Sequence, residues 1–359
     1  EEVDAVDGVA VVQAGAILQN VQEDLAKHGF LFPLDFGARG SCTIGGCIAT
    51  NAGGINVLRY GMARQNVLGL EAVLADGTVV SSMNRMLKNN TGYDLKQLFI
   101  GSEGTLGVVT RAVFRLYPLS ASRQTAMIAT DSFAAVVRLL KSMRAELAGT
   151  LSAFEVMWDS YVGVVTAPGA HTLPFDRRHV YYVLAEAEGS NPATDDERFE
   201  ALLGRALESG DIGDAVIPKS NAERVALWQI REEFDAVLPA YLYDVSLPIR
   251  YMVPYVARLE ERLRAWRDDA ECIVFGHIAD GNLHIFVRPY DEGSHHAACD
   301  EIVYTSLDGF SGSISAEHGI GLDKKQWLGR SRSEDELRLM QQLKHVLDPK
   351  NLLNPGRII

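Results

Sequence analysis

The first residues of the chain carry two short patterns of apolar positions. An apolar run over residues 8–12 has the length of a strand, and Ile17, Val21 and Leu25 then recur at the spacing of a helix that Gly29 ends. The beginning of the chain therefore predicts a strand followed by an amphipathic helix.

A hairpin and a further strand are predicted next. Residues 67–74 and 78–80 flank Asp76-Gly77, a pair that favours a type I′ turn, and residues 108–116 alternate as a strand does. Together with the first strand and helix, they predict a mixed α+β sheet domain over residues 1–118.

Longer helical patterns dominate beyond Pro118, with strand patterns between them. These predict a second domain, residues 119–325, in which helices cover an antiparallel sheet. A capping box from Ser333 to Glu336 starts a final helix, so residues 326–359 form a tail that we expect to return to the first domain. The predicted helices are 133–147, 196–207, 222–238 and 255–266, and the predicted strands lie around 181–187 and 273–287.

Composition and charge narrow the class of protein. The net charge of −13 argues against a nucleic-acid or anionic-membrane partner, which would require clustered Lys and Arg. No apolar run approaches the ~20 residues of a membrane span, and the acidic start lacks the basic region of a signal peptide. The four scattered cysteines predict reduced thiols. We therefore expect a protein that is cytoplasmic or peripheral to the inner membrane.

Two glycine-rich segments indicate a dinucleotide site. Residues 40–54 read GSCTIGGCIATNAGG and residues 101–109 read GSEGTLGVV. Glycines let the backbone approach an anionic ligand, and the hydroxyls of Ser41, Thr43 and Thr50 add donors for phosphate oxygens. Tight turns without a ligand are the alternative. The spacing does not match the Rossmann fingerprint, so another dinucleotide fold is implied.

A pair of histidines indicates a metal site in the second domain. Residues 273–287 read IVFGHIADGNLHIFV, and a turn at Asp280-Gly281 would place His277 directly opposite His284. Opposed side chains are close enough to share one ion, and Glu317 would complete a His₂Glu set with an open position. Surface histidines without a metal are the alternative interpretation.

Five ordered motifs resemble one flavoprotein family. The runs TIGGCIATNAGG, RYG, NVLGLEAVLADG, KNNTGYDL and LFIGSEGTLGVVT, between residues 43 and 110, resemble the FAD domain of the vanillyl-alcohol oxidase and p-cresol methylhydroxylase family. The rest of the chain resembles that family's C-terminal cap domain. The resemblance implies non-covalent FAD, held by Pro33, Ser41, Thr43, Gly45, Gly46, Thr50, Asn51, Gly53, Gly54, Glu103, Gly104, Gly107, Val109 and Asn354.

One part of the family pattern has no counterpart here. Family members carry an upstream subdomain with a glycine-rich pyrophosphate loop, and nothing before Glu1 supplies it. We therefore expect the FAD-binding domain of this chain to lack its N-terminal part, and the chain to hold its flavin poorly without it.

The histidine motif resembles the branch of the family that oxidises D-2-hydroxy acids. GHIADGNLH with AEHG implies that His277, His284 and Glu317 hold a divalent metal, zinc or manganese, and that His318 is the base. Arg231 resembles the arginine that binds the substrate carboxylate. The expected reaction passes the α-hydrogen to flavin N5 as a hydride and the electrons to a separate acceptor, such as electron-transfer flavoprotein, a quinone or a cytochrome.

The substrate and three other functions stay open. In relatives acting on D-2-hydroxyglutarate, polar residues stand near the positions of Asp235, Leu242 and Phe286, so D-lactate or another acid with a small or apolar tail is favoured. The alternatives are the flavin subunit of glycolate oxidase, a transferase like alkyl-glycerone-phosphate synthase, and a non-catalytic flavin-binding subunit. A homodimer is compatible with each of them.

Overall fold

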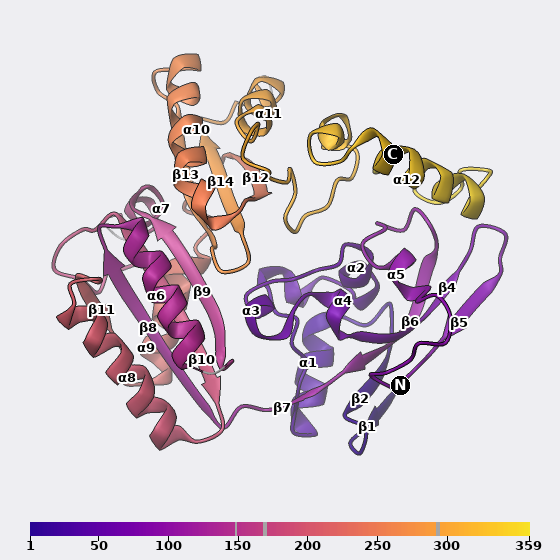
Figure 1. Ribbon diagram of the computed structural model, residues 1–359, viewed down its shortest axis with the longest axis horizontal. Coiled ribbons are helices and arrows are strands. Elements are labelled where there is room, and N and C mark those ends of the chain that lie inside the picture. The colour runs from indigo at the N-terminus through magenta and orange to yellow at the C-terminus, as the bar shows by residue number, and fades with distance from the viewer. Residues whose placement is uncertain (148, 168–170, 292–294) are drawn as a thin grey trace. The chain divides into compact units, whose positions relative to one another are not determined.

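The structure is a computed structural model that describes residues 1–147, 149–167, 171–291 and 295–359 (Figure 1). Its contacts divide the chain into two units: unit 1 comprises Glu1–Leu119 and Glu317–Ile359, and unit 2 comprises Ser120–Ala316. Both units combine helices with antiparallel sheets, so the predicted α+β class is confirmed. The chain re-enters unit 1 at Glu317, before the predicted position 326, because the residues after Glu317 bond to Glu103 of unit 1.

Unit 1 is built on a five-stranded antiparallel sheet with the order β1-β2-β6-β4-β5. Because side chains alternate across a strand, Ala10 and Val12 face the main core of the unit, where they join Leu18 and Leu25 of a helix. The strands are β1 (Glu2–Asp4), β2 (Val9–Gln13), β4 (Val67–Val73), β5 (Val79–Ser82) and β6 (Val108–Arg115), with a separate pair of β3 (Phe30–Leu31) and β7 (Tyr117–Pro118).

The hairpin between β4 and β5 turns differently from the prediction. Val73 pairs with Val79, and Leu74 and Thr78 bond across the end of the ladder, which leaves three residues in the loop. Gly77 has φ of +85°, but Asp76 is not among the residues of positive φ, as a type I′ turn would require. The type I′ prediction is therefore wrong, and the loop has the glycine position of a three-residue hairpin.

Unit 2 is built on a seven-stranded antiparallel sheet with the order β11-β8-β10-β9-β13-β14-β12. Strands β9 and β10 are buried along their whole length, so both faces of the sheet are covered there. Figure 1 shows helix α6 in front of β8–β10 and α9 behind them. The strands are β8 (Ser122–Thr130), β9 (Leu151–Trp158), β10 (Tyr181–Gly189), β11 (Asp214–Val216), β12 (Tyr241–Ser246), β13 (Glu271–His277) and β14 (Asn282–Arg288).

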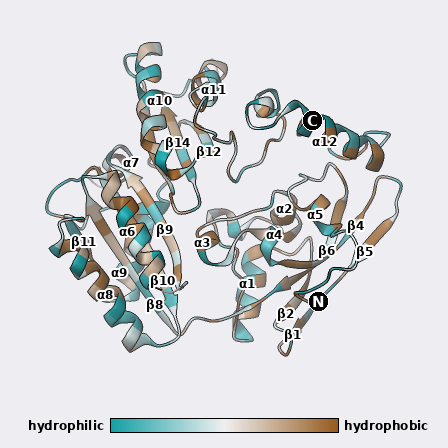
Figure 2. Ribbon diagram, in the orientation of Figure 1, coloured by the Kyte–Doolittle hydropathy of each residue, from teal (hydrophilic) through white to brown (hydrophobic). Residues whose placement is uncertain are grey.

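Four helices of unit 2 lie where helices were predicted, and two, Asp159–Val165 and His296–Thr305, were not predicted. Helix α9 ends at Glu232 and not at Leu238, because the backbone of Glu233 leaves the helical conformation, with φ of −79° and ψ of 71°. Figure 2 shows brown and teal residues mixed along α6 and α8, as expected for helices with one face on a sheet. The helices are α6 (Phe133–Glu146), α7 (Asp159–Val165), α8 (Pro192–Glu208), α9 (Asn221–Glu232), α10 (Met252–Trp266) and α11 (His296–Thr305), with a 3₁₀ turn η2 (Ile249–Tyr251).

The helices of unit 1 are shorter, apart from the first and the last. The last, α12, begins at the predicted capping box, in which Ser333 and Glu336 each accept a backbone N–H of the other. The helices are α1 (Leu18–Lys27), α2 (Ile44–Ala49), α3 (Val57–Tyr60), α4 (Ala63–Asn66), α5 (Lys96–Phe99) and α12 (Glu334–Leu347), with 3₁₀ turns η1 (Gly37–Gly40) and η3 (Lys325–Arg330).

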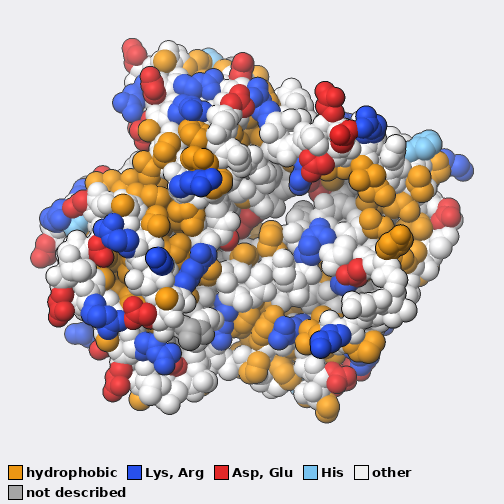
Figure 3. All heavy atoms as spheres, in the orientation of Figure 1, with side chains coloured by type: hydrophobic (Ala, Val, Ile, Leu, Met, Phe, Trp, Pro, Cys, Tyr) orange, Lys and Arg blue, Asp and Glu red, His pale blue; other side chains and the backbone are white. Residues whose placement is uncertain are grey.

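Surface charge and thiols agree with the composition. Acidic and basic side chains intermingle on the face drawn in Figure 3. Cys42, Cys47, Cys272 and Cys299 are free, and the sulfurs of Cys42 and Cys47 lie 3.8 Å apart. Within the described ranges, every helix is too short or too polar to cross a membrane.

A buried carboxylate anchors the tail of unit 1. Asp348 accepts hydrogen bonds from the N–H groups of Leu352 and Leu353 at 2.9 and 2.7 Å and from Lys344. Lys344 also donates to the carbonyl of Thr105 at 3.0 Å, which ties the tail to the second glycine-rich segment. Burial alone would raise the pKa of Asp348, but these hydrogen bonds lower it to about 2.

The Asp348 anchor makes the stability of the protein depend on pH. A depressed pKa means that the carboxylate stabilises the fold above its ordinary pKa of about 3.9, and that this contribution is lost as the pH falls towards about 2. Asp348→Asn should lower the urea midpoint near neutral pH, and its difference from the wild type should shrink between about pH 4 and about pH 2. The exposed Asp335, substituted in the same way, is the control and should show a smaller difference. A difference for Asp348→Asn that does not change with pH would contradict the assignment.

Candidate functional site

The two predicted histidines lie on one face of the β13–β14 hairpin, but they are not directly opposed. His284 pairs with Phe275, and a four-residue turn, residues 278–281, follows His277. The predicted register is therefore wrong by two residues. Because side chains alternate with a period of two, this shift keeps both imidazoles on the same face, as diagonal neighbours with ring centroids 5.4 Å apart.

A buried carboxylate on the neighbouring strand binds His277. Glu155 of β9 pairs with His277 in the sheet, and its Oε1 lies 2.6 Å from His277 Nδ1. A carboxylate at Nδ1 favours the tautomer that carries the proton there, which leaves Nε2 as the ring atom that could bind a metal. Glu155 was not predicted from the sequence, although it is a lone charge in the apolar run of residues 151–158.

Arg231 completes this buried cluster from the last turn of α9. Its Nε donates to Glu155 Oε2 at 2.8 Å, its Nη2 lies 3.2 Å from His277 Nε2, and its guanidinium lies over the ring of Phe275 at 4.6 Å. Burial alone would raise the pKa of Glu155, but its contacts with His277 and Arg231 more than offset this effect and lower the pKa to about 2. The sequence associated Arg231 with a substrate carboxylate, whereas here it binds a carboxylate of the protein.

A second buried carboxylate holds the segment that leads to Glu317. Asp244 of β12 pairs with His284 and accepts hydrogen bonds from the Ala316 N–H at 2.9 Å and from the Ser315 hydroxyl at 3.2 Å. Ser313 forms a bridge with Ser246 at the end of the same strand. The segment of residues 313–316 is thereby fixed along β12. Asp244 was also missed by the sequence analysis, and it too is a lone charge in a strand pattern.

The third predicted ligand directly follows this fixed segment. Glu317 is the first residue after the boundary of the two units, and its carboxylate and the ring nitrogens of His277 and His284 lie within 4.8 Å of one another. Two imidazole nitrogens and a carboxylate oxygen are a donor set that suits a divalent cation such as zinc. Asn282 adds a buried amide oxygen that has no hydrogen-bond partner among the described residues. These residues fit the metal that the sequence implies.

His318 differs from Glu317 in its environment. The Glu317 side chain is half-buried, whereas His318 is exposed. The two residues lie in a bend and not in a strand, and they nevertheless present their side chains to different surroundings. This arrangement allows one residue to bind an ion while its neighbour contacts a solvated molecule.

Three of the predicted cofactor residues share one face of α2. Thr43, Gly46 and Thr50 are spaced three and four residues apart and are half-buried or exposed, while Ile44 and Ile48 are buried in the core. Hydroxyls beside a position without a Cβ suit the approach of a phosphate or a flavin edge, so this face fits the cofactor that the sequence implies. Ser41 and Pro33 lie in the segment before the helix.

The N–H groups at the start of α2 already have protein partners. Ile44 and Gly45 donate to the carbonyls of Ala16 and Ala14, and Gly46 donates to the Thr43 hydroxyl. A ligand at this turn would therefore meet a smooth backbone surface and hydroxyls, and not these three N–H groups.

Several of the predicted glycines are required by the packing of unit 1 itself. A Cβ on Gly54 would lie 2.1 Å from the Asp35 carbonyl oxygen, and one on Gly45 or Gly107 would lie under 3 Å from a side-chain carbon of Ala14 or Phe99. Gly53 would similarly meet Val57. Part of the glycine-rich sequence is therefore explained by tight packing of the chain against itself, without a ligand.

The two glycine-rich segments lie side by side in unit 1. Gly101 N–H donates to the Ile48 carbonyl at 3.0 Å, and Glu103 N–H donates to the Ala49 carbonyl at 2.8 Å. Asn354 of the tail donates through its side chain to the Glu103 carbonyl and lies against Gly104. Two predicted residues that are 251 positions apart in sequence, Glu103 and Asn354, are therefore neighbours here, while Val109 lies on the adjoining strand β6.

Asn51, Glu103 and Asn354 all adopt a left-handed backbone conformation, with φ of 52°, 51° and 43°. Such conformations cost free energy for residues other than glycine, and they concentrate where a fold or a site requires them. All three are among the predicted cofactor residues.

The predicted substrate-selecting residues fall into two groups. Leu242 of β12 and Phe286 of β14 are cross-strand partners on the same face as the neighbouring pair of Asp244 and His284. Asp235 is exposed and lies in the segment after α9. Leu242 and Phe286 therefore form an apolar pair beside His284, as a site for an acid with an apolar tail would require.

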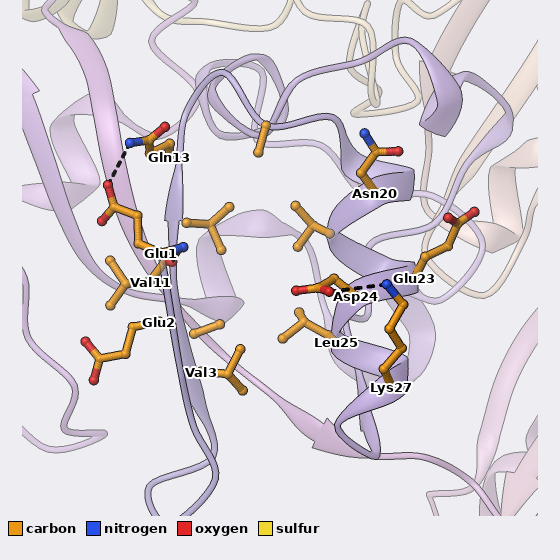
Figure 4. Close-up of a pocket in the computed structure, with 14 residues that line it drawn as sticks. Glu1, Glu2, Val3, Val11, Gln13, Asn20, Glu23, Asp24, Leu25 and Lys27 are labelled. Carbon is orange, nitrogen blue, oxygen red and sulfur yellow. Dashed lines mark hydrogen bonds and ion pairs between the residues drawn. The ribbon is translucent and has the colours of Figure 1, made fainter.

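The cavity of about 570 Å³ in Figure 4 lies elsewhere in unit 1, between β2 and α1. Glu1, Glu2, Glu23 and Asp24 line it, against Lys27. Among the described lining residues, none belongs to the predicted cofactor or metal sets. An acidic lining disfavours a pyrophosphate, so we do not assign the dinucleotide to this cavity.

Comparisons with known families agree with the motifs. Residues 119–358 match the family described as FAD linked oxidases, C-terminal domain, and residues 1–82 match the FAD binding domain.

Named relatives cover nearly the whole chain. The chain is 42% identical to a mitochondrial D-2-hydroxyglutarate dehydrogenase of Bos taurus and to a D-2-hydroxyglutarate dehydrogenase of Xanthomonas citri pv. viticola, in both over 99% of its length. It is 38% identical to a mitochondrial protein of Schizosaccharomyces pombe whose name includes D-lactate dehydrogenase. The chain spans 65%, 76% and 70% of these relatives, respectively.

A solved structure shares the fold at low sequence identity. The structure of an alkyldihydroxyacetonephosphate synthase aligns with 99% of this chain, with a TM-score of 0.72 and 16% sequence identity. The alignment covers 66% of the synthase chain. This likeness concerns the fold alone.

The buried Glu155 cluster predicts a large cost of removing its centre. Glu155→Ala leaves the Arg231 guanidinium buried without its carboxylate, so the free energy of unfolding should fall by about 3–5 kcal/mol in urea titrations. Glu260→Ala is the control: Glu260 pairs with Arg264 one helical turn away on the surface of α10, and its removal should change the free energy of unfolding by under about 0.5 kcal/mol. Equal effects of the two substitutions would show that the cluster does not stabilise unit 2.

Proposed function

The chain belongs to the family of FAD linked oxidases, and from this premise we propose that the whole protein oxidises a D-2-hydroxy acid to the 2-oxo acid with FAD as hydride acceptor. The observation that carries the proposal is the grouping of His277, His284 and Glu317, with ligand atoms within 4.8 Å of one another. The names of the relatives support the same class of substrate.

The metal ligands are His277, His284 and Glu317. Glu155 orients His277 through Nδ1, and Asp244 fixes the segment before Glu317. Both carboxylates therefore orient metal ligands without binding the metal themselves. A bound divalent cation supplies a Lewis acid that lowers the pKa of the substrate's α-hydroxyl, and a bound flavin supplies the hydride acceptor at N5.

Two side chains contact the reacting substrate, one to accept its α-hydroxyl proton and one to bind its carboxylate. His318, which is exposed next to Glu317, accepts the α-hydroxyl proton, as an imidazole can near neutral pH. Arg231 binds the substrate carboxylate. A guanidinium has five N–H groups, and Glu155 fixes its plane through Nε, so the outer groups are pre-oriented.

The flavin is held in unit 1. Thr43, Gly46 and Thr50 on the open face of α2 contact it, with Asn51, Glu103, Gly104 and Asn354 at the junction of the glycine-rich segments and the tail. Pro33, Ser41, Gly45, Gly53, Gly54, Gly107 and Val109 complete the set.

An acid with a small or apolar tail, such as D-lactate, is the preferred substrate in this proposal. Leu242 and Phe286 offer no charge to a second carboxylate, and Asp235 would repel one. D-2-hydroxyglutarate is the second candidate, and the names of the relatives favour it. Electrons leave to a separate acceptor such as electron-transfer flavoprotein, a quinone or a cytochrome. The cytoplasmic location and the homodimer stay predictions.

Anaerobic reduction of the full-length flavoprotein tests the reaction class. D-2-hydroxy acids should bleach the flavin absorbance and L-2-hydroxy acids should not, and kcat/KM for D-lactate should exceed that for D-2-hydroxyglutarate. Bleaching by the L-acids alone would overturn the stereochemistry. A flavin that no 2-hydroxy acid reduces would favour a non-oxidative enzyme of the same fold or a non-catalytic subunit.

His318→Ala tests the proton acceptor. Removal of a general base should lower kcat by about 10²–10⁴-fold without a change in flavin content, measured by absorbance. His345→Ala on α12 is the control and should keep the wild-type rate, because His345 is outside the site. A fully active His318→Ala protein would exclude this role.

Metal analysis of the purified protein tests the ligands. We expect about one divalent ion per chain, lost on chelation together with activity and restored by zinc or manganese. His284→Ala should bind the ion at least about tenfold more weakly, while the Asn282→Ala protein keeps all three ligands and should bind it more strongly than the His284 variant. A protein that contains no metal, and that added metal does not activate, would contradict the assignment.

A further inference from the structure

Glu103 contacts three separate parts of unit 1 through its carboxylate and its backbone. Its carboxylate accepts hydrogen bonds from the backbone of two successive residues, from Ile320 N–H to Oε1 at 2.6 Å and from Gly321 N–H to Oε2 at 2.8 Å. Its own N–H donates to the Ala49 carbonyl, and its carbonyl accepts from the Asn354 side chain. One residue therefore connects α2, the tail and the turn of residues 319–321, all of them in unit 1.

The local backbone is shaped to allow this contact. Glu103 adopts φ of 51°, a conformation that costs free energy for a residue with a long side chain. Gly319 adopts φ of 80°, and a Cβ there would lie 2.6 Å from Glu103 Oε1. A glycine at position 319 adopts this φ readily and leaves room for the carboxylate to reach the two N–H groups beyond it.

The turn that Glu103 holds begins directly after His318. On the other side of the Glu317-His318 pair, Asp244 accepts the N–H of Ala316. A carboxylate thus fixes the backbone on each side of this pair of residues. The Glu103 contact therefore restrains the backbone directly after His318.

We propose that Glu103 is a positioning residue for Glu317 and His318, acting through the backbone of residues 319–321. The inference rests on the proposed function for the roles of that pair. Each carboxylate oxygen of Glu103 accepts an N–H group of the chain, and the proposed role depends on these two bonds and not on a contact with the cofactor. Its backbone can still border the flavin.

Glu103→Gln is the sharpest test, because an amide has the same shape but only one acceptor oxygen. One of the two N–H groups loses its partner, so the amides of Ile320 and Gly321 should exchange hydrogen at least about tenfold faster in the flavin-loaded protein. The kcat should fall about 10–100-fold, as it does when a residue behind a ligand is lost, with KM for the acid and the FAD dissociation constant within about twofold of the wild type.

Gly319→Ala is a second variant that leaves Glu103 itself intact. Its Cβ displaces the carboxylate, so it should reproduce the faster exchange and the loss of kcat. Glu336→Gln is the matched control: the Glu336 carboxylate also accepts a backbone N–H, from Ser333 at 2.8 Å, and its substitution should leave kcat unchanged.

The possible results separate the roles. A rise in the FAD dissociation constant in parallel with the loss of kcat would overturn the proposal in favour of a cofactor contact. An unchanged kcat with an intact fold would overturn it as well. Faster exchange at residues 320 and 321 in a protein that oxidises no 2-hydroxy acid would overturn the proposed function, while the link between Glu103 and the turn would stand.

Discussion

The arrangement of the site depends on a carboxylate that is kept charged inside unit 2. Glu155 is 1% exposed, and a carboxylate so far from water is stable only with paired charges and full hydrogen bonding. Arg231 of α9 provides the paired charge, and Arg231 and His277 of the next strand both bond to the carboxylate. Glu155 also sets the tautomer of His277 and the plane of the Arg231 guanidinium. The geometry of two functional side chains therefore follows from the pairing of one buried charge.

The backbone around Glu317 and His318 is controlled in a related way. Asp244 and Glu103 bind backbone N–H groups on either side of the pair. Loops are mobile unless their backbone groups are bonded, so two residues in a bend need such support more than residues in a strand do. The sheet holds the two histidines, whereas carboxylates bind the backbone on either side of Glu317 and His318.

The glycines of the glycine-rich segments in unit 1 have two kinds of surroundings. Gly54, Gly45 and Gly107 are required where the chain packs against its own atoms, and Gly46 lies on the open face of α2 between Thr43 and Thr50. The same lack of a Cβ that lets a ligand approach also lets two backbone segments meet. A sequence shows both kinds of glycine alike, and only the neighbours distinguish them.

The sequence alone determined the fold class, the family and the identity of the histidine pair, because these depend on residue types at fixed local spacings. It even placed both imidazoles on one face, since a period-two pattern tolerates a register error of two residues. Tertiary structure decided the rest. Glu155 and Asp244 are single charges in apolar strands, and their partners come from segments tens of residues away in sequence.

Glu103 is the clearest case of what only the tertiary structure decides. It stands in a recognisable cofactor motif, and its carboxylate meets residues more than 200 positions later. Long-range pairing of this kind depends on how the tail folds back onto the glycine-rich segments. Local patterns carry no information about that distance, so they predicted the site's chemistry but not the carboxylates that hold it in place.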